Sequence, residues 1–119
     1  MRILGLMSGT SCDGLDCIDI SINLDKSYTL DFQINNFTTV PYSNKDKAFL
    51  LSIRNKSGDL INNSDEVTRI FINCMNAFVN INNQYDMIAC HGHTVKHIDK
   101  VLSVQLVSPK MLYDKYKIP

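Results

Sequence analysis

The sequence has no excess of charge of either sign and no long apolar run. Among its 119 residues, 12 Lys and Arg balance 12 Asp and Glu, which excludes the domain-wide basic surface typical of nucleic-acid-binding proteins. No apolar segment approaches the roughly 18 residues of a membrane-spanning helix. The apolar start Met1–Met7 reaches Gly9 and Asp13 too early to contain a secretion signal. We therefore expect no nucleic-acid or membrane partner, and a cytoplasmic location.

The cysteines lack the spacing of a metal site. No CxxC pair and no zinc-ribbon pattern occurs among Cys12, Cys17, Cys74 and Cys90. Because we expect a chain that is not secreted, these thiols should stay reduced. We therefore predict four free, incidental cysteines.

The composition is that of an ordinary globular domain, with 45% hydrophobic and 20% charged residues. Alternation of apolar and polar residues and short apolar runs mark the expected strands. These strands are residues 2–7, 15–24, 28–42, 86–90 and 102–107. The first three, joined by short turns, predict an antiparallel meander. His91–His97, between the last two strands, is expected to be a polar loop or a strand end.

Apolar residues at helical spacing predict three helices. The first is capped by Asn44 and runs to Ile53, and Ser57–Asp59 forms a break after it. The second is capped by Asn63, with Glu66 three residues later, and runs to about Asn80. The third follows a cap at Ser108, has Pro109 at its first position and ends near Tyr116.

The predicted order is strand-strand-strand-helix-helix-strand-strand-helix. This order favours an α/β fold in which a mixed sheet combines the meander with parallel strands and carries helices on its faces. It matches the ribonuclease-H-like unit, which is the repeated half of actin-like ATPases and sugar kinases.

A run of small residues follows the first expected strand. Gly9 and Gly14 permit positive φ angles and a close approach of the backbone to a ligand. Thr10 and Ser11 offer hydroxyl groups, and successive backbone N–H groups in such a turn can form an anion-binding nest. The segment is therefore a candidate phosphate-binding loop, although a plain β-turn of small residues is an alternative.

Two carboxylates accompany this loop. Asp13 and Asp16 could hold Mg²⁺ through water, because this ion usually takes one or two carboxylates together with phosphate oxygens. The segment lacks the GxxxxGK[ST] pattern of a Walker A loop, and a strand rather than a helix is expected after it.

Three histidines lie close together near the fourth expected strand. If that strand continues, His91 and His93 face the same side, and His97 adds a third imidazole. Such a set could bind a metal, but no carboxylate lies at a diagnostic spacing. Alternatively, the histidines and Thr94 could hydrogen-bond a polyhydroxylated substrate, or the segment could be an ordinary strand end.

Three blocks give the chain a family resemblance. Residues 5–16, GLMSGTSCDGLD, are similar to the GxMSGTSxDGxD signature of the anhydro-N-acetylmuramic acid kinase family. Residues 90–97, CHGHTVKH, are similar to its CHGQTVxH block. Residues 104–109 and the closing Ile118–Pro119 resemble its LQxGDP…GIP stretch. The blocks keep the family's order, and the chain resembles the N-terminal part of that family.

The resemblance implies a two-domain, actin-like, ATP-dependent kinase. Such an enzyme opens the 1,6-anhydro ring of anhydro-N-acetylmuramic acid with water and phosphorylates O6. The product is N-acetylmuramic acid 6-phosphate, in the recycling of murein. The implied partners are ATP with Mg²⁺, the amino sugar and, in the full-length family form, a second copy in a homodimer.

The resemblance also assigns residues to the two ligands. The ATP-phosphate loop comprises Gly9, Thr10, Ser11, Cys12, Asp13, Gly14, Leu15 and Asp16. The substrate cleft is assigned His91, His93 and Thr94. The family's catalytic aspartate belongs to a later DFRxxDxxxGGxGAP block, so no catalytic residue and no metal ligand is assigned among these 119 residues.

The chain departs from the family pattern at several positions. His93 replaces a usual Gln, Cys12 a common Leu, and Val107 and Ser108 a usual Gly-Asp pair. Family members are also much longer. We therefore expect residues 1–119 to form a truncated N-terminal kinase subdomain without the C-terminal nucleotide-binding half, inactive alone. The alternatives are a stand-alone phosphate- or sugar-binding module and a small metal-binding protein built on the three histidines.

Overall fold

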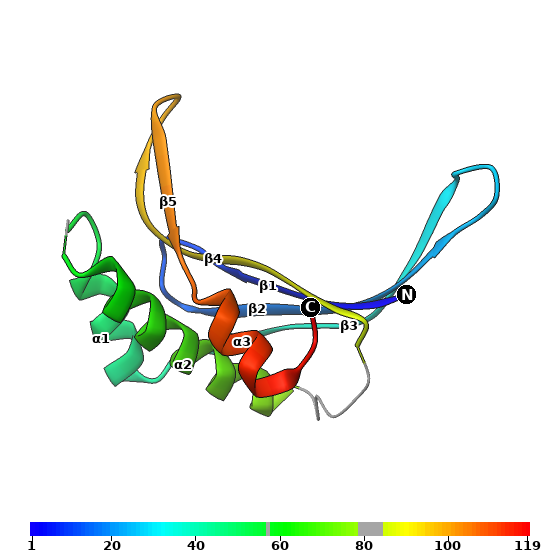
Figure 1. The fold of residues 1–119 in the computed structure, drawn as a ribbon. Coiled ribbons are helices and arrows are strands. Elements are labelled where there is room, and N and C mark those ends of the chain that lie inside the picture. Colours follow the sequence, from blue (N-terminus) through cyan, green and yellow to red (C-terminus); the bar gives the residue numbers. More distant parts are fainter. Residues whose placement is uncertain (57, 79–84) are drawn as a thin grey trace.

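A computed structural model describes residues 1–56, 58–78 and 85–119. Within these residues the chain forms five strands and three helices (Figure 1). The strands are β1 (Arg2–Ser8), β2 (Gly14–Leu24), β3 (Leu30–Pro41), β4 (Met87–Ile98) and β5 (Leu102–Leu106). The helices are α1 (Asn44–Ser52), α2 (Leu60–Phe78) and α3 (Pro109–Tyr116).

The strands form one mixed sheet in the order β3-β2-β1-β4-β5. The strands β1, β2 and β3 pair antiparallel, as the predicted meander requires. The strand β4 is parallel to β1, whereas β5 returns as a hairpin and pairs antiparallel with β4. The predicted α/β class with a mixed sheet is confirmed, and it is consistent with a half-domain of an actin-like kinase. Parallel pairing in the described sheet is confined to β1 and β4.

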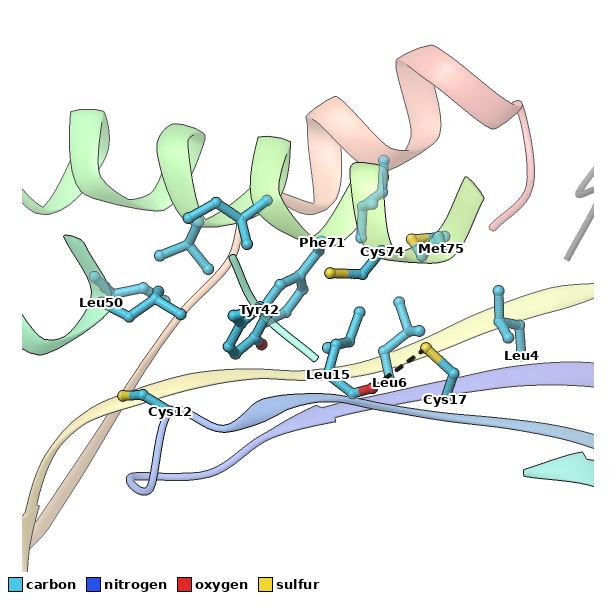
Figure 2. Packing of buried hydrophobic residues seen from close by; sticks show 14 of the residues in the cluster. Leu4, Leu6, Cys12, Leu15, Cys17, Tyr42, Leu50, Phe71, Cys74 and Met75 are labelled. Carbon is cyan, nitrogen blue, oxygen red and sulfur yellow. Dashed lines mark hydrogen bonds between the residues drawn. The ribbon is translucent and has the colours of Figure 1, made fainter. Parts of the chain in front are cut away.

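The helices cover one face of the sheet (Figure 1). Alternation along β2 buries Leu15 and Cys17 under the helices, while Asp16 and Ile18 point to the other face. The apolar stripe of α2 packs onto this buried layer through Phe71 and its neighbours (Figure 2). The centre of the hydrophobic core therefore lies between α2 and the strands β1 and β2.

The opposite face of the sheet carries exposed apolar side chains. The largest belong to β3, where Leu30, Phe32, Ile34 and Phe37 are each more than half exposed. Their partners along β2 have side chains on the same face, for example Ile20 opposite Ile34. None of the helices in the described part of the chain is long and apolar enough to cross a membrane.

Two helix starts differ from the sequence prediction. The cap of α1 is Ser43, whose Oγ accepts the Asp46 N–H, so the expected cap Asn44 is the first helical residue. The helix α2 begins three residues before the expected cap Asn63, because the Asp59 carboxylate already accepts the Asn62 N–H at 3.0 Å. The expected end of that helix at Asn80, and Ser57 of the expected break, lie outside the described residues.

The third helix keeps its expected position and its expected cap residue, but the cap makes a different contact. Ser108 lies at the cap, but its side chain makes no cap hydrogen bond to any residue that the structure describes. Its backbone N–H instead donates to Thr68 Oγ1 of α2 at 2.8 Å. The start of α3 is thereby attached to the longest helix.

Candidate functional site

The β1–β2 loop (Gly9–Asp13) lies where β1 ends. Because β1 and β4 are parallel, the carboxyl end of β1 lies beside β4, with Ser8 opposite His93 in the sheet register. The loop lies between the β4–β5 hairpin and α1 (Figure 1). In open α/β sheets, ligands bind outside the carboxyl ends of parallel strands. The fold therefore places the predicted phosphate loop at a position suited to binding.

The loop divides into outward and inward side chains. Thr10, Ser11 and Asp13 are exposed, whereas Cys12 is fully buried. Of the other residues assigned to this loop by resemblance, Leu15 is buried in the core, and Gly9, Gly14 and Asp16 are partly exposed. The hydroxyls and the carboxylate that could meet a ligand are thus the accessible groups.

The strained backbone of the loop is not at its glycines. Cys12 has φ of 55°, in the left-handed region that side chains disfavour, and Gly9 and Gly14 do not. Gly14 is required for a different reason: a Cβ there would lie 2.5 Å from the Val40 carbonyl oxygen of β3. A Cβ at Gly9 meets no described atom within 4 Å. Gly9 therefore leaves open space beside the loop, as a bound ligand would need.

A lysine that the sequence reasoning missed reaches the loop. Lys47, in the first turn of α1, donates to Asp13 Oδ1 at 2.8 Å. This hydrogen bond and the lysine charge lower the pKa of Asp13. The only sequence signal was a basic residue at the start of a helix that follows the meander. The loop therefore has an ammonium group next to its exposed carboxylate.

Behind the loop lies a buried chain of polar groups. Tyr42 OH donates to Ser8 Oγ at 2.8 Å, and Ser8 Oγ lies 2.8 Å from His93 Nδ1. The other ring nitrogen, Nε2, lies 3.8 Å from Cys12 Sγ. Ser8 and His93 are fully buried, and Tyr42 is 8% exposed. We call these four residues the buried polar chain.

Burial keeps the members of this chain uncharged. Desolvation, with a contribution from the Arg54 charge, lowers the pKa of His93 to about 4. Desolvation also raises the pKa of Cys12 and of Tyr42. At neutral pH the imidazole is therefore neutral, and the thiol and phenol keep their protons.

His91 and His93 do not share a face, contrary to the expectation for a continuing strand. The strand does continue, but two residues of β4 lie opposite one of β1 between the pairs Leu6–Cys90 and Ser8–His93. Gly92, with φ of 83°, is part of this bulge. A bulge shifts the alternation by one residue, so His91 is exposed and His93 is buried.

The bulge also separates the proposed imidazole ligands. Across the described residues, no group of three or more His, Cys, Asp or Glu side chains could hold a metal ion. The interpretation as a small three-histidine metal protein therefore has no support in the geometry. The four cysteines are free, as predicted.

His91 belongs to the uncovered face of the sheet. It lines a groove of about 510 Å³ together with Asp16 and the apolar side chains of Met7, Ile18 and Phe37. Asp16 also accepts a hydrogen bond from Thr39 Oγ1 at 2.5 Å. The groove thus brings together one residue assigned to the phosphate loop and one assigned to the substrate cleft.

Thr94 and His93 do not line this groove. Thr94 is partly exposed and pairs with Gln105 of β5. His93 directs both ring nitrogens toward protein groups, Ser8 and Cys12. A sugar contact by either residue stays a prediction.

Comparison with known proteins decides the family. The model of the family described as "Anhydro-N-acetylmuramic acid kinase" matches residues 1–119. The chain belongs to this family. Both blocks lie within the matched residues, and the fold brings Ser8 of the first block against His93 of the second.

Individual members of the anhydro-N-acetylmuramic acid kinase family support this assignment. A relative from Bacillus thuringiensis subsp. konkukian is 34% identical over 109 residues, 84% of this chain and 28% of its own length. Relatives from Haemophilus influenzae and Neisseria meningitidis serogroup C are 31% and 29% identical, over 79% and 97% of this chain. The chain spans 25% and 33% of the lengths of these two relatives.

Two residues that the sequence analysis expected to depart from the family pattern contact each other. The thiol of Cys12 lies 3.8 Å from Nε2 of the His93 imidazole. Sequence reasoning singled out both residues but not their contact, because 81 residues separate them. It also missed Tyr42, and the only local signal was an aromatic residue at the end of the predicted third strand.

Proposed function

We propose that the β1–β2 loop binds the phosphates of ATP with Mg²⁺, and that the chain supplies the N-terminal part of a kinase acting on anhydro-N-acetylmuramic acid. The observation that carries this proposal is the arrangement at the carboxyl end of β1. There, the β1–β2 loop exposes the hydroxyls of Thr10 and Ser11 and has open space at Gly9, and the ammonium of Lys47 lies beside it. Membership of the family supplies the kinase class.

The residues present suit a phosphate group. Hydroxyls of Thr10 and Ser11 and backbone N–H groups of the loop would donate to phosphate oxygens, and Lys47 would exchange its Asp13 partner for phosphate. Asp13 is an exposed carboxylate that would hold Mg²⁺ through water. When bound, the ion neutralises phosphate charge and orients the transferred group. Phosphoryl transfer depends mainly on such positioning and charge stabilisation.

The proposed sugar contacts come from β4. His91 and Thr94, both accessible on β4, would hydrogen-bond hydroxyls of the amino sugar. The proposed reaction opens the anhydro ring with water and transfers phosphate to O6, giving N-acetylmuramic acid 6-phosphate. Because the chain spans 25–33% of the relatives compared, segments corresponding to their remaining length would complete the site. A homodimer and a cytoplasmic location are part of this proposal.

A titration of the ¹⁵N-labelled chain with Mg·ATP tests the phosphate site. We expect the amide NMR signals of Gly9–Asp13 to shift first. Lys47→Met should weaken binding about tenfold, the effect of losing one charge-assisted hydrogen bond. The matched control is Lys110→Met, which removes the same charge from an exposed pair with Asp114 on α3. Loop signals that stay unchanged at millimolar ATP would refute the phosphate site.

Product analysis tests the reaction. We expect the 119-residue chain alone to give no phosphorylated sugar from ATP, Mg²⁺ and anhydro-N-acetylmuramic acid. A fusion of these residues to the remaining length of the Neisseria relative should give N-acetylmuramic acid 6-phosphate by mass spectrometry. A fusion that folds and binds ATP without turnover would instead favour a non-catalytic binding module.

A further inference from the structure

We propose that His93 and Tyr42 are positioning residues that together fix the conformation of the β1–β2 loop, each by contacting both of its ends. The inference rests on the proposed function only in taking phosphate as the ligand of that loop. Neither residue meets the ligand. Both act through Ser8 at the start of the loop and through Cys12 and Asp13 at its end.

The start of the loop is held at Ser8. Ser8 is the last residue of β1, directly before Gly9. Its hydroxyl accepts from Tyr42 OH and lies 2.8 Å from His93 Nδ1. Because Nδ1 is the remaining acceptor near this hydroxyl among the described residues, we infer that Ser8 Oγ donates its one proton to Nδ1. The side chain of Ser8 therefore has a single orientation.

The end of the loop is held by the same two residues. His93 Nε2 lies 3.8 Å from Cys12 Sγ, and the Tyr42 N–H donates to the Asp13 carbonyl oxygen at 3.2 Å. Cys12 also donates through its thiol to the Thr10 carbonyl oxygen at 3.6 Å. The buried polar chain therefore extends from Tyr42, directly after β3, to the backbone of the ligand-facing residues.

The loop needs external restraint because its backbone is strained. Cys12 is a left-handed residue with a side chain, a conformation that persists only where surrounding structure determines it. Within the loop itself, Cys12 is held only by two long hydrogen bonds among the described atoms: its N–H donates to the Gly9 carbonyl oxygen at 3.4 Å, and its thiol donates to the Thr10 carbonyl oxygen at 3.6 Å. His93 and Tyr42 provide the additional contacts that make the strained turn stable.

The direction of the hydrogen bonds requires one tautomer of His93. With Nδ1 accepting from Ser8, the ring proton of the neutral imidazole lies on Nε2 and points at Cys12 Sγ. In the opposite tautomer Ser8 Oγ would accept from both Tyr42 OH and Nδ1–H, and its own buried proton would have no acceptor among the described residues. The tautomer is therefore a spectroscopic signature of the positioning arrangement.

The test compares Tyr42→Phe with a matched control in the 119-residue chain. Tyr42→Phe removes one buried hydroxyl and keeps the ring and the backbone contact to Asp13. The control, Tyr116→Phe, removes a hydroxyl that donates to Asn76 Oδ1 between α3 and α2, far from the loop in sequence. Three quantities are measured: the ¹⁵N shifts of the His93 ring, amide hydrogen exchange at Gly9–Asp13, and the Kd for inorganic phosphate and for Mg·ATP.

We expect the Nε2–H tautomer in the wild type. Tyr42→Phe should raise loop exchange and both Kd values by about three- to tenfold, the factor for one buried hydrogen bond, and Tyr116→Phe should change neither. His93→Gln should keep loop exchange and both Kd values within about twofold of the wild type, because an amide can accept from Ser8 and donate to Cys12. His93→Leu should raise loop exchange and both Kd values more than Tyr42→Phe does. If His93→Leu fails to fold, the results for Tyr42→Phe and His93→Gln decide whether the positioning role holds.

Failure of the proposal and failure of the proposed function are distinguishable. If the wild type binds neither phosphate nor ATP, the phosphate site is wrong, and the tautomer and loop exchange still test the positioning role. An Nδ1–H tautomer would overturn the positioning role. So would equal loop exchange in Tyr42→Phe and Tyr116→Phe.

Discussion

Acidification to pH 4 should destabilise the protein through His93. The imidazole is fully buried, and burial lowers its pKa from 6.5 to about 4. As the pH falls through 6.5, the unfolded chain binds a proton that the folded chain does not, so the free energy of unfolding decreases. The decrease continues until the folded-state pKa near 4 is reached. The difference between the two pKa values corresponds to about 3 kcal/mol.

The carboxylates change the free energy of unfolding at lower pH than His93 does. Hydrogen bonds from Arg2 are the main cause that lowers the pKa of Asp19 below its ordinary 3.8. A carboxylate of this kind contributes stability that is present above 3.8 and is lost as the pH falls through its folded-state pKa. A loss of stability between pH 6.5 and 4.5 therefore reports His93 rather than the part-buried ion pair of Arg2 with Asp19.

Urea unfolding monitored by circular dichroism measures this effect. The free energy of unfolding would be determined between pH 7 and 4.5 for the wild type, His93→Gln and His97→Gln. We expect the wild type and His97→Gln, which changes an exposed histidine, to lose most of the 3 kcal/mol. His93→Gln should show little pH dependence in this range. Equal slopes for all three proteins would refute the assignment to His93.

Four further substitutions test the packing and the Arg2–Asp19 ion pair by urea unfolding. Gly14→Ala should cost about 1–3 kcal/mol because its Cβ would overlap the Val40 carbonyl, whereas Gly9→Ala should change stability by less than about 0.5 kcal/mol; equal stability of the two would contradict the steric argument. Asp19→Asn should cost about 2 kcal/mol, since a charge-assisted pair is lost, and an unchanged midpoint would show that the pair contributes nothing. Phe71→Ala should cost about 3–5 kcal/mol at a fully buried core position, and a loss below 1 kcal/mol would argue against the packing of α2.

The meander and the helices could be predicted because their signals are local. Alternation along residues 15–24 predicted β2, and Pro109 predicted the first position of α3. Helix starts were less certain, because several side chains nearby could cap. In the structure Ser43 caps α1 in place of Asn44, and Asp59 caps α2 in place of Asn63. All four are residue types that favour the cap position, so the local sequence does not distinguish between them.

The strand β4 extends eight residues beyond Cys90, through residues 91–97, for which the sequence left a polar loop and a strand end open. The sequence beyond Cys90 is polar and its alternation is broken at the Gly92 bulge. Backbone pairing with β1 and β5 nevertheless keeps residues 91–98 in the sheet. Pairing with strands on both sides outweighs the weak intrinsic preference of the polar segment.

The sequence by itself determined the fold class, the family and the position of the candidate phosphate loop. These depend on residues that are close in the chain, such as the small residues between β1 and β2. Only the tertiary structure decided which loop side chains face solvent, that Lys47 reaches Asp13, and that His93 meets Cys12. Each of these contacts joins positions 34 or more residues apart. The physical reason is that burial and hydrogen bonding at such distances depend on strand register, and the Gly92 bulge shifted that register by one residue.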